Sequence, residues 1–349
     1  MPIGVNVSGT NKQATMKVNV SGVWKYPIGW VREGGQWRKF QNPEYTYTIS
    51  QNTANFNLAT AVGSREEVII NLVINPGVSV YSTSVNTPAI VIPDSFAGKT
   101  INIINNGNIY GQGGVGGTGV GQAGGPALRV QTSQKINLTN NGTIAGGGGG
   151  GGKGGTGGNG FFTTQSTQRD PASGTWSYAT GNHIEFRSRN CILRMGGGEI
   201  YRWYGPDFST VVTYGITITV GEWTYYASNF YNDGVGVLKS NAMYRTRAVT
   251  NTTYTTGGAG GNGGNGQGFS QAATNGLAGA NGGTNAGRGG NGGTGGTFGV
   301  AGNAGASGAN GNQTAGLAGQ AGGAAGAAVD GTSKVNYVNA GKLLGPLIN

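Results

Sequence analysis

"IAGGGGGGGKGGTGGNG", residues 144–160, contains seven consecutive glycines, Gly146 to Gly152. Glycine in regular structure costs up to about 1 kcal/mol relative to alanine, so the first interpretation of such a run is a flexible linker. The spacing of the other glycines argues against a linker. From Gly287 to Gly311 a glycine occupies every third position, and the segments 257–266, 276–282 and 316–322 keep the same step. The chain has 74 glycines in 349 residues, and many of them fall into this register.

A period of three residues matches an extended left-handed helix with a rise of about 3.1 Å per residue. Such a helix makes no internal hydrogen bonds, so its N–H and C=O groups need partners on neighbouring chains. Collagen meets this need with three proline-rich chains, but residues 207–345 contain no proline. The spacing therefore predicts a bundle of polyglycine-II helices that bond to each other through the backbone. Glycine is required wherever two helices touch, and seven in a row predict a helix buried on all sides.

Composition limits the functions that the chain can have. Apolar residues make up 36% and charged residues 10%, too few for a conventional core through the whole chain. The net charge is +10 without a basic stripe, so we expect no nucleic-acid partner. One cysteine and one histidine exclude a disulfide scaffold and a metal cluster, and we expect no cofactor. The start "MPIGVNVSGTNKQ" lacks a signal peptide and "VIINLVI" is too short to span a membrane, so we expect a soluble protein made in a cytoplasm.

A second repeat surrounds the first glycine runs. "PAIVIPDSFAGKTINIINNGNIYG" (88–111) and "PALRVQTSQKINLTNNGTIAG" (126–146) share an aliphatic strand followed by Asn-Asn-Gly, and weaker copies lie at 70–80 and 327–345. The alternation predicts strands with one buried face, and Asn-Gly predicts a tight turn with positive φ. We therefore expect a short β-solenoid over residues 51–145, closed by a rung at 327–349. The polyglycine helices, 146–160 and 257–326, are expected to leave and return between rungs.

Two further segments have their own character. Residues 1–50 contain "VWKYPIGWVREGGQWRKF", which predicts a small β unit with a hairpin turn at Gly34-Gly35 and with Trp24, Trp30 and Trp37 mainly in its core. Residues 161–256 hold 17 of the 31 aromatic residues and alternate as strands, which predicts an inserted β domain with its own core. The predicted fold class is therefore all-β plus polyglycine-II.

Motifs for catalysis are weak. The run "GGGGGGGKGG" approaches a phosphate-binding loop, but Lys153 is followed by Gly154 and no helix-forming sequence follows. A serine or cysteine nucleophile would need His183 as its base, and no Gly-x-Ser-x-Gly is present. The carboxylate pairs Glu185 with Glu199, or Asp207 with Glu222, are the only basis for a glycosidase, and their spacing does not support one. We predict that the chain is not an enzyme, with cleavage of surface polysaccharide as an alternative.

The segments "TINIINNGNIYGQGG", "GGPALRV" and "INLTNNGTIAGGGGGGGKGG" resemble the receptor-recognition adhesins at the tail-fibre tips of T-even-like bacteriophages. The resemblance covers roughly residues 65–160 and, in architecture, 257–345. It implies layered polyglycine-II helices that present variable loops to a host outer-membrane protein or to lipopolysaccharide. It also implies that an N-terminal region, here residues 1–50, attaches the protein to the tail fibre, at the distal tip of the virion.

Carried over by position, the resemblance makes the loops between glycine runs candidate receptor contacts: Phe269, Gln271, Asn285, Arg288, Phe298 and Gln313. The insert at 161–256 departs from the compact members of that family and is a candidate receptor-binding head. Its aromatic residues are further candidates, about half of them expected in the core: Trp176, Tyr178, Tyr201, Trp203, Tyr204, Trp223, Tyr225 and Tyr226.

Two other functions stay open at this stage. The chain is a purely structural component of a tail fibre if all of its aromatics are core. A polyglycine ice-binding protein would need a flat outward row of Thr or Ala, of which "GLAGANGG" and "GLAGQAGGAAGAA" offer a little. The host, the receptor and the oligomeric state are not encoded in any motif of the sequence.

Overall fold

The structure is a computed structural model that describes residues 3–7, 10–14, 18–21, 23–25, 30–39, 44–63, 67, 69–187, 190–204 and 215–349. The chain divides into two compact units. Unit 1 contains Met1–Gly160 and Thr255–Asn349, and unit 2 contains Phe161–Tyr254. Within the described ranges, none of the helices has the length and apolar character needed to cross a membrane.

Three antiparallel hairpins begin the chain: β1 (Ile3–Val7) with β2 (Thr10–Ala14), β3 (Val18–Val20) with β4 (Val23–Lys25), and β5 (Trp30–Glu33) with β6 (Gln36–Lys39). Gly34 and Gly35 form the two-residue turn between β5 and β6, with φ of 59° and 80°. Two central residues with positive φ match the twist of a hairpin, and the predicted turn is confirmed. The side chains of the three tryptophans expected in a core here lie outside the described part of the chain.

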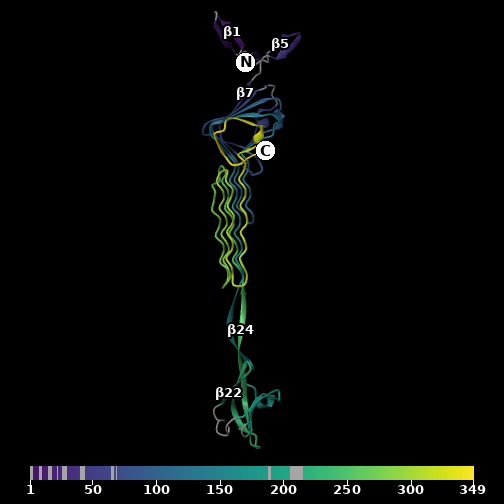
Figure 1. Cartoon of the computed structure of the whole chain (residues 1–349), viewed down its shortest axis with the longest axis vertical. Helices are drawn as coiled ribbons and strands as arrows, with labels where there is room; N and C mark the ends of the chain where they lie inside the picture. The colour runs from purple at the N-terminus through teal and green to yellow at the C-terminus, as the bar shows by residue number, and fades with distance from the viewer. Residues whose placement is uncertain are drawn as a thin grey trace. The chain divides into compact units, whose positions relative to one another are not determined.

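Three five-stranded parallel sheets form the solenoid of unit 1 (Figure 1). Each rung contributes one strand to each sheet. The first sheet contains β7 (Glu44–Ile49), β10 (Ile69–Ile74), β13 (Thr100–Asn105), β16 (Ile136–Asn140) and β26 (Val335–Asn339). The second contains β8 (Thr53–Ala54), β11 (Ser79–Tyr81), β14 (Asn108–Tyr110), β17 (Thr143–Ala145) and β27 (Lys342–Leu344). The third contains β9 (Phe56–Asn57), β12 (Ile90–Ile92), β15 (Leu128–Val130), β25 (Val329–Asp330) and β28 (Leu347–Ile348).

The predicted solenoid is confirmed, but it begins earlier than residue 51. β7 was expected in the N-terminal unit, and it pairs in parallel with β10 as the first strand of the solenoid. Short helices complete the rungs: α1 (Leu58–Val62), η1 (Asp94–Phe96) and η4 (Thr332–Lys334).

Alternation along the strands fills the solenoid with aliphatic side chains. Ile70, Leu72 and Ile74 of β10 are fully buried, and in the parallel register Ile70 and Leu72 lie beside Ile101 and Ile103 of β13. A register shift of one residue would move every apolar side chain of a strand to the solvent face, so the pattern also fixes the register.

Asparagine ladders run between the rungs at the turns. The amide of Asn105, which is fully buried, donates to Asn140 Oδ1 at 2.7 Å, and Asn140 Nδ2 donates to the carbonyl of Ala340 at 2.7 Å. The predicted reason for Asn-Gly was wrong, because neither Gly107 nor Gly142 has a positive φ. A Cβ on Gly142 would lie 1.8 Å from the carbonyl oxygen of Gly107, so glycine is required for the close stacking of rungs.

The glycine runs leave the solenoid inside a rung, whereas they were expected between rungs. Residues 111–127 connect β14 to β15, and the long excursion at 146–328, which includes unit 2, connects β17 to β25. β14 and β17 are neighbours in the second sheet, so both excursions begin at the same corner of the solenoid. This common origin places the runs side by side, as the wavy traces of Figure 1 show.

The central run, residues 146–158, is bonded to six neighbours. Its N–H groups donate in rotation to three runs, at N···O distances of 2.7 to 3.0 Å: 119–125, 258–267 and 300–309. Its carbonyl groups accept from three other runs: 114–117, 287–299 and 317–326. Each neighbour bonds at every third residue, so every backbone N–H and C=O group of residues 147–153 has a partner without any side chain.

Close contact between backbones excludes side chains from the central run. A Cβ on Gly150 would lie 2.0 Å from the Val115 oxygen, and one on Gly149 would lie 2.0 Å from the Gly323 oxygen. All residues from 146 to 152 are buried, which confirms the predicted burial of the seven glycines. The run of glycines ends at Lys153, because the run at 111–117 turns back at 118–120 and leaves that side of the central run open.

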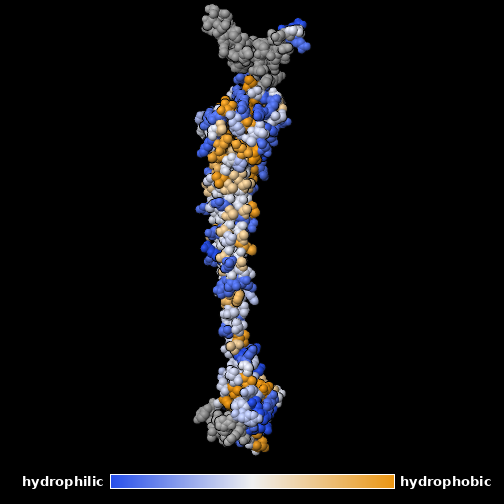
Figure 2. Space-filling model, in the orientation of Figure 1, coloured by the Kyte–Doolittle hydropathy of each residue, from blue (hydrophilic) through white to orange (hydrophobic). Residues whose placement is uncertain are grey.

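The outer runs carry small and polar side chains on their free sides. Figure 2 shows the bundle surface as mostly pale, with single blue and orange residues. Large exposed apolar residues such as Leu277 and Leu317 occur singly here, and scattered apolar residues are normal on a protein surface.

Unit 2 is an antiparallel β domain, which confirms the predicted insert. Its strands follow the order β21-β20-β19-β24-β23-β22, and β18 also pairs with β24. The elements are β18 (Gly160–Asp170), η2 (Tyr178–Thr180), β19 (His183–Arg187), β20 (Asn190–Met195), β21 (Gly198–Tyr204), β22 (Ile216–Val220), β23 (Trp223–Asn232) and β24 (Val237–Thr255). A separate core includes Ile184, Phe186, Leu193 and Met243.

We expect Gly150→Ala to destabilise unit 1 by about 3 kcal/mol, at the upper end of overpacking effects, because the added methyl group meets backbone that cannot turn aside. Lys153→Ala is the matched control one turn along the same side. Chemical denaturation of the two variants measures the difference. Equal stabilities would show that the central run has room for side chains.

We expect Asn140→Ala to lower the free energy of unfolding by about 1–3 kcal/mol, because it leaves buried partners in the ladder unsatisfied. Asn141→Ala removes an exposed ladder residue and should cost less than about 0.5 kcal/mol. Thermal melting compares the two, and a larger loss for the Asn141 variant would contradict the role assigned to the inner ladder.

Candidate functional site

Three of the predicted loop residues lie where the bundle meets the solenoid. Phe269 stacks on Tyr81 with ring centroids 4.2 Å apart, and Phe298 stacks on Tyr110 at 4.5 Å. Gln271 accepts a hydrogen bond from Gln112 at 3.1 Å and donates to a glycine carbonyl at 2.9 Å. These contacts join loops of the bundle to the corner from which the glycine runs emerge.

The other predicted loop residues lie toward the opposite end of the bundle. Asn285 and Gln313 are exposed, and their loops bond to each other and to the last residues of the central run. Asn285 has a φ of 60°, a left-handed conformation that asparagine tolerates well. Arg288 is exposed and its Nε donates to the Gly279 carbonyl at 3.1 Å. The sequence did not show which loops lie at which end of the bundle. Successive glycine runs alternate in direction, so the end at which a loop lies depends on how many runs precede it.

The aromatic candidates of unit 2 fall into three groups. Tyr225 is only 3% exposed and lies in the core. A second group packs partly buried against the core: Trp176, Trp203 and Trp223. The remaining candidates reach solvent to different degrees, with Tyr178 and Tyr226 half-buried, Tyr201 exposed by 43% and Tyr204 by 77%. The two exposed tyrosines share β21, the edge strand of the sheet.

Arginine side chains that sequence reasoning missed cover the aromatic residues. Arg245 Cζ lies 4.1 Å from the centroid of Trp223, and Arg245 Nη2 contacts Asp170 at 2.7 Å. On the other face of β24, Arg169 lies 4.2 Å from the ring of Tyr244. Alternation along β24 was the available signal, since Arg245 and Arg247 fall on the same face as the core residue Met243.

A cleft of about 380 Å³ opens on the face of the sheet opposite this core. Its walls include Tyr178, His183, Glu185, Arg187 and Arg194. Glu185 is almost fully buried and its Oε1 is 2.8 Å from Arg194 Nε. Burial raises the pKa of Glu185, but the hydrogen bond and charge of Arg194 outweigh it, and the net pKa is lowered. Burial lowers the pKa of His183.

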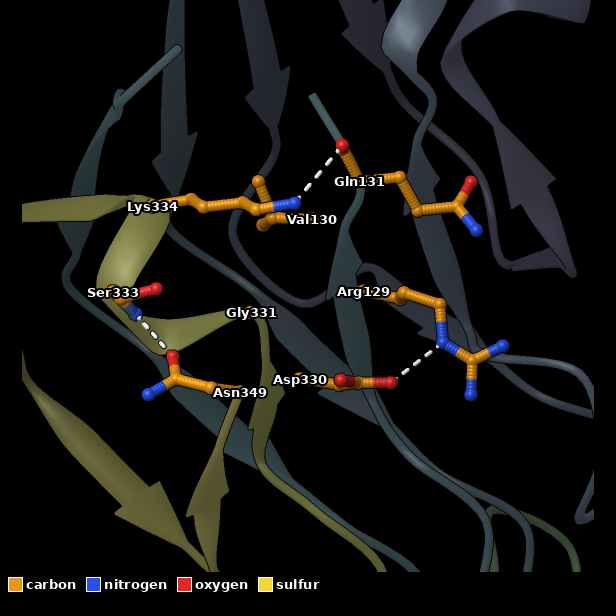
Figure 3. A pocket seen from close by; sticks show the side chains of 8 residues that line it. All are labelled: Arg129, Val130, Gln131, Asp330, Gly331, Ser333, Lys334 and Asn349. Atoms are coloured by element: carbon orange, nitrogen blue, oxygen red, sulfur yellow. Dashed lines mark hydrogen bonds and ion pairs between the residues drawn. The ribbon is translucent and has the colours of Figure 1, made fainter. Parts of the chain in front are cut away.

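A second cleft, of about 360 Å³, lies on the last three rungs of the solenoid (Figure 3). Arg129 Nε and Asp330 Oδ2 are 2.6 Å apart across it, and Lys334 Nζ donates to the Gln131 carbonyl at 3.0 Å. The Ser333 N–H donates to Asn349. The charged groups of this cleft therefore already have partners within the chain.

The catalytic alternatives gain no support from these positions. Glu199 pairs with Arg202 at 2.6 Å, and this hydrogen bond lowers its pKa. Glu185 also has a lowered pKa, so neither carboxylate is suited to donate a proton as a general acid at neutral pH. Asp207 lies outside the described residues, and Glu222 pairs with Arg247. Among the described residues, no three metal-ligating side chains come together.

Comparison with known proteins finds a family model that matches part of the chain. Residues 44–201 match the model of the family described as phage tail fibre adhesin Gp38. The matched range begins at β7 and includes the central glycine run and unit 2 as far as β21. The predicted resemblance to tail-fibre adhesins is thus confirmed over residues 44–201.

Among solved structures, the crystal structure of the gp37–gp38 adhesin tip complex of the bacteriophage S16 long tail fibre matches the chain. The sequence identity is 18%, with 87% of this chain and 82% of that chain covered, at a TM-score of 0.39. None of the curated proteins compared with the sequence matches it.

We expect the stability of unit 2 to fall as the pH drops below about 6.5. The folded pKa of His183 is lowered from 6.5, so the unfolded chain takes up a proton that the folded unit does not, and the free energy of unfolding decreases. Glu185, Arg194, Lys239 and Tyr178 face the ring, and the lowered pKa of Glu185 adds a loss only in more acidic solution.

NMR of the single histidine measures this pKa directly, and melting of unit 2 at pH 7.5 and 5.5 measures its consequence. His183→Gln should remove the pH dependence between these values. A ring that titrates at or above pH 6.5 would contradict the assignment.

Proposed function

We propose that this chain is a bacteriophage tail-fibre tip adhesin that binds a host outer-membrane protein or lipopolysaccharide. The observation that carries the proposal is the match of residues 44–201 to the tail-fibre adhesin family, since it includes the solenoid strands from β7 to β17 and the central glycine run. The protein would be made in the host cytoplasm and assembled at the distal tip of the fibre.

The scaffold for this function is a bundle of polyglycine-II helices. In that conformation three residues complete one turn, so successive N–H groups point in three directions. The rotation of donors from the central run through three neighbours, one every third residue, supports this conformation. A bundle held by its backbone needs no side-chain core, so its loops are free to vary without loss of the fold.

The receptor contacts are assigned to exposed residues of two regions. In unit 2 these are Tyr201 and Tyr204 on the edge strand β21, because tyrosine offers a large contact area at a small entropic cost. In unit 1 they are Asn285, Arg288 and Gln313, toward the end of the bundle opposite the solenoid. The stacked Phe269 and Phe298, and the buried Tyr225, act in folding in this proposal.

Attachment to the fibre is assigned to residues 1–50, the part of the chain that precedes and begins the solenoid. The matched crystal structure is a complex of gp38 with gp37. By analogy, the partner of residues 1–50 is a tail-fibre protein of the same virion.

The experiment is binding of the purified protein to susceptible cells and competition with the phage for adsorption. We expect the wild-type chain to coat the cells and block adsorption. The double variant Tyr201→Ser, Tyr204→Ser should reduce binding at least about thirtyfold, because one hot-spot aromatic contributes about 2 kcal/mol.

Tyr254→Ser is the matched control, since this tyrosine is 68% exposed but lies at the end of β24, away from the edge strand β21. Absence of cell binding by the wild type would favour a purely structural fibre component. Equal losses in the double variant and the control would contradict the assignment to β21.

A further inference from the structure

The cleft on the polar face of unit 2 contains a group of charges that is not fully balanced. Two arginines approach one carboxylate: Arg194 Nε is 2.8 Å and Arg187 Nε 3.4 Å from Glu185 Oε1. Glu185 is only 3% exposed, whereas Arg187 is 54% exposed at the mouth of the cleft. The two guanidinium groups carry two positive charges and the buried carboxylate carries one negative charge, so this group has a net charge of +1.

The neighbouring charges do not supply the missing anion. Lys239 pairs with Asp233 at 3.0 Å, and Arg202 pairs with Glu199 at 2.6 Å. His183 lies 3.6 Å from Glu185 Oε2, and its lowered pKa keeps it neutral at pH 7. Within the described residues, the group around Glu185 therefore carries one net positive charge in a partly enclosed site, where a charge is poorly screened.

One other feature of the cleft suits a sugar. Tyr178 lines the same cleft, and Lys239 Nζ donates to its hydroxyl group at 2.8 Å, which fixes an aromatic side chain beside the arginines. Both ring nitrogens of His183 are buried, so this ring is part of the cleft wall and not a ligand-binding group. The solenoid cleft of Figure 3 differs, because its charged groups are paired and it has no aromatic wall.

The geometry of the binding group favours a carboxylate over a phosphate. A guanidinium presents parallel N–H donors that match a planar carboxylate in a bidentate contact. A carboxylate also carries one negative charge, which equals the charge left over, whereas a phosphate monoester carries nearly two at pH 7.

We propose that the cleft of unit 2 binds an acidic, carboxylate-bearing sugar of a bacterial surface glycan. The carboxylate contacts Arg187 and Arg194, and the sugar ring lies against Tyr178. Glu185 acts as a positioning residue that holds both arginines at the cleft. This proposal rests on the adhesin function and names the chemistry of its ligand.

The test uses the full chain with the ring of His183 labelled for NMR, titrated with glucuronate, methyl glucoside and acetate. We expect glucuronate to shift the His183 signals in a saturable way. Methyl glucoside, which lacks the carboxylate, and acetate, which lacks the sugar ring, should bind at least about tenfold more weakly. Arg187→Gln should weaken glucuronate binding about tenfold, the effect of one charge-assisted hydrogen bond. Arg247→Gln, an ion-paired arginine outside the cleft, is the matched control.

Arg187 is half exposed, so its variant should fold, and an unchanged melting temperature verifies this. Failure of glucuronate to shift His183, or equal binding by acetate, would overturn the proposal. Cell binding by the wild-type chain separates the two claims. If the protein binds cells but glucuronate does not shift the His183 signals, only the sugar site is contradicted. If the protein binds glucuronate but not cells, only the adhesin function is contradicted.

Discussion

The structure depends on one constraint: an extended glycine chain has no internal hydrogen bonds, so every N–H and C=O group must find a partner on a neighbour. In the central run this need is met in three directions at once, and each direction is closed to side chains by a carbonyl oxygen about 2 Å from the Cβ position. The entropic loss of ordering so many glycines is offset by backbone bonds, which are complete from residue 147 to residue 153. Because of the same contacts, a side chain added at one buried glycine would displace the backbone of at least one neighbouring run as well as its own.

The solenoid supplies the conditions under which this bundle forms. Its parallel rungs place the ends of β14 and β17 at one corner, so that the excursions begin side by side and in register. Stacking of Phe269 on Tyr81 and of Phe298 on Tyr110 fixes two returning loops at that corner. A small aliphatic core thus sets the register of a much larger assembly that has no core of its own. For the proposed adhesin function, this arrangement separates stability from recognition, because exposed loops and unit 2 can change while the backbone network stays the same.

Much of this organisation could be predicted from the sequence, because both periodicities leave clear signals. Steps of three identified the glycine bundle, and alternation identified the rungs and their buried face. The sequence did not show that excursions interrupt a rung, since strands of two or three residues such as β25 carry no pattern of their own. The sequence also led to a wrong prediction for Asn-Gly. Glycine is needed there because the rungs stack closely, and not because the turn has a positive φ. For the candidate site, aromatic content pointed to unit 2, but only the fold separates core Tyr225 from exposed Tyr204. The charge group around Glu185 is assembled from different strands and had no local signature.

Hydrogen exchange of the backbone amides at residues 147–155 tests the central claim most directly. Each of these N–H groups is bonded to another run, so the account predicts slow exchange, comparable to that of the aliphatic strand β10. The exposed loop at 172–175 in unit 2 serves as the internal reference for fast exchange. Exchange of the central glycines at the rate of that loop would contradict the account, because it would mean that the run behaves as a tether and that no rigid scaffold exists.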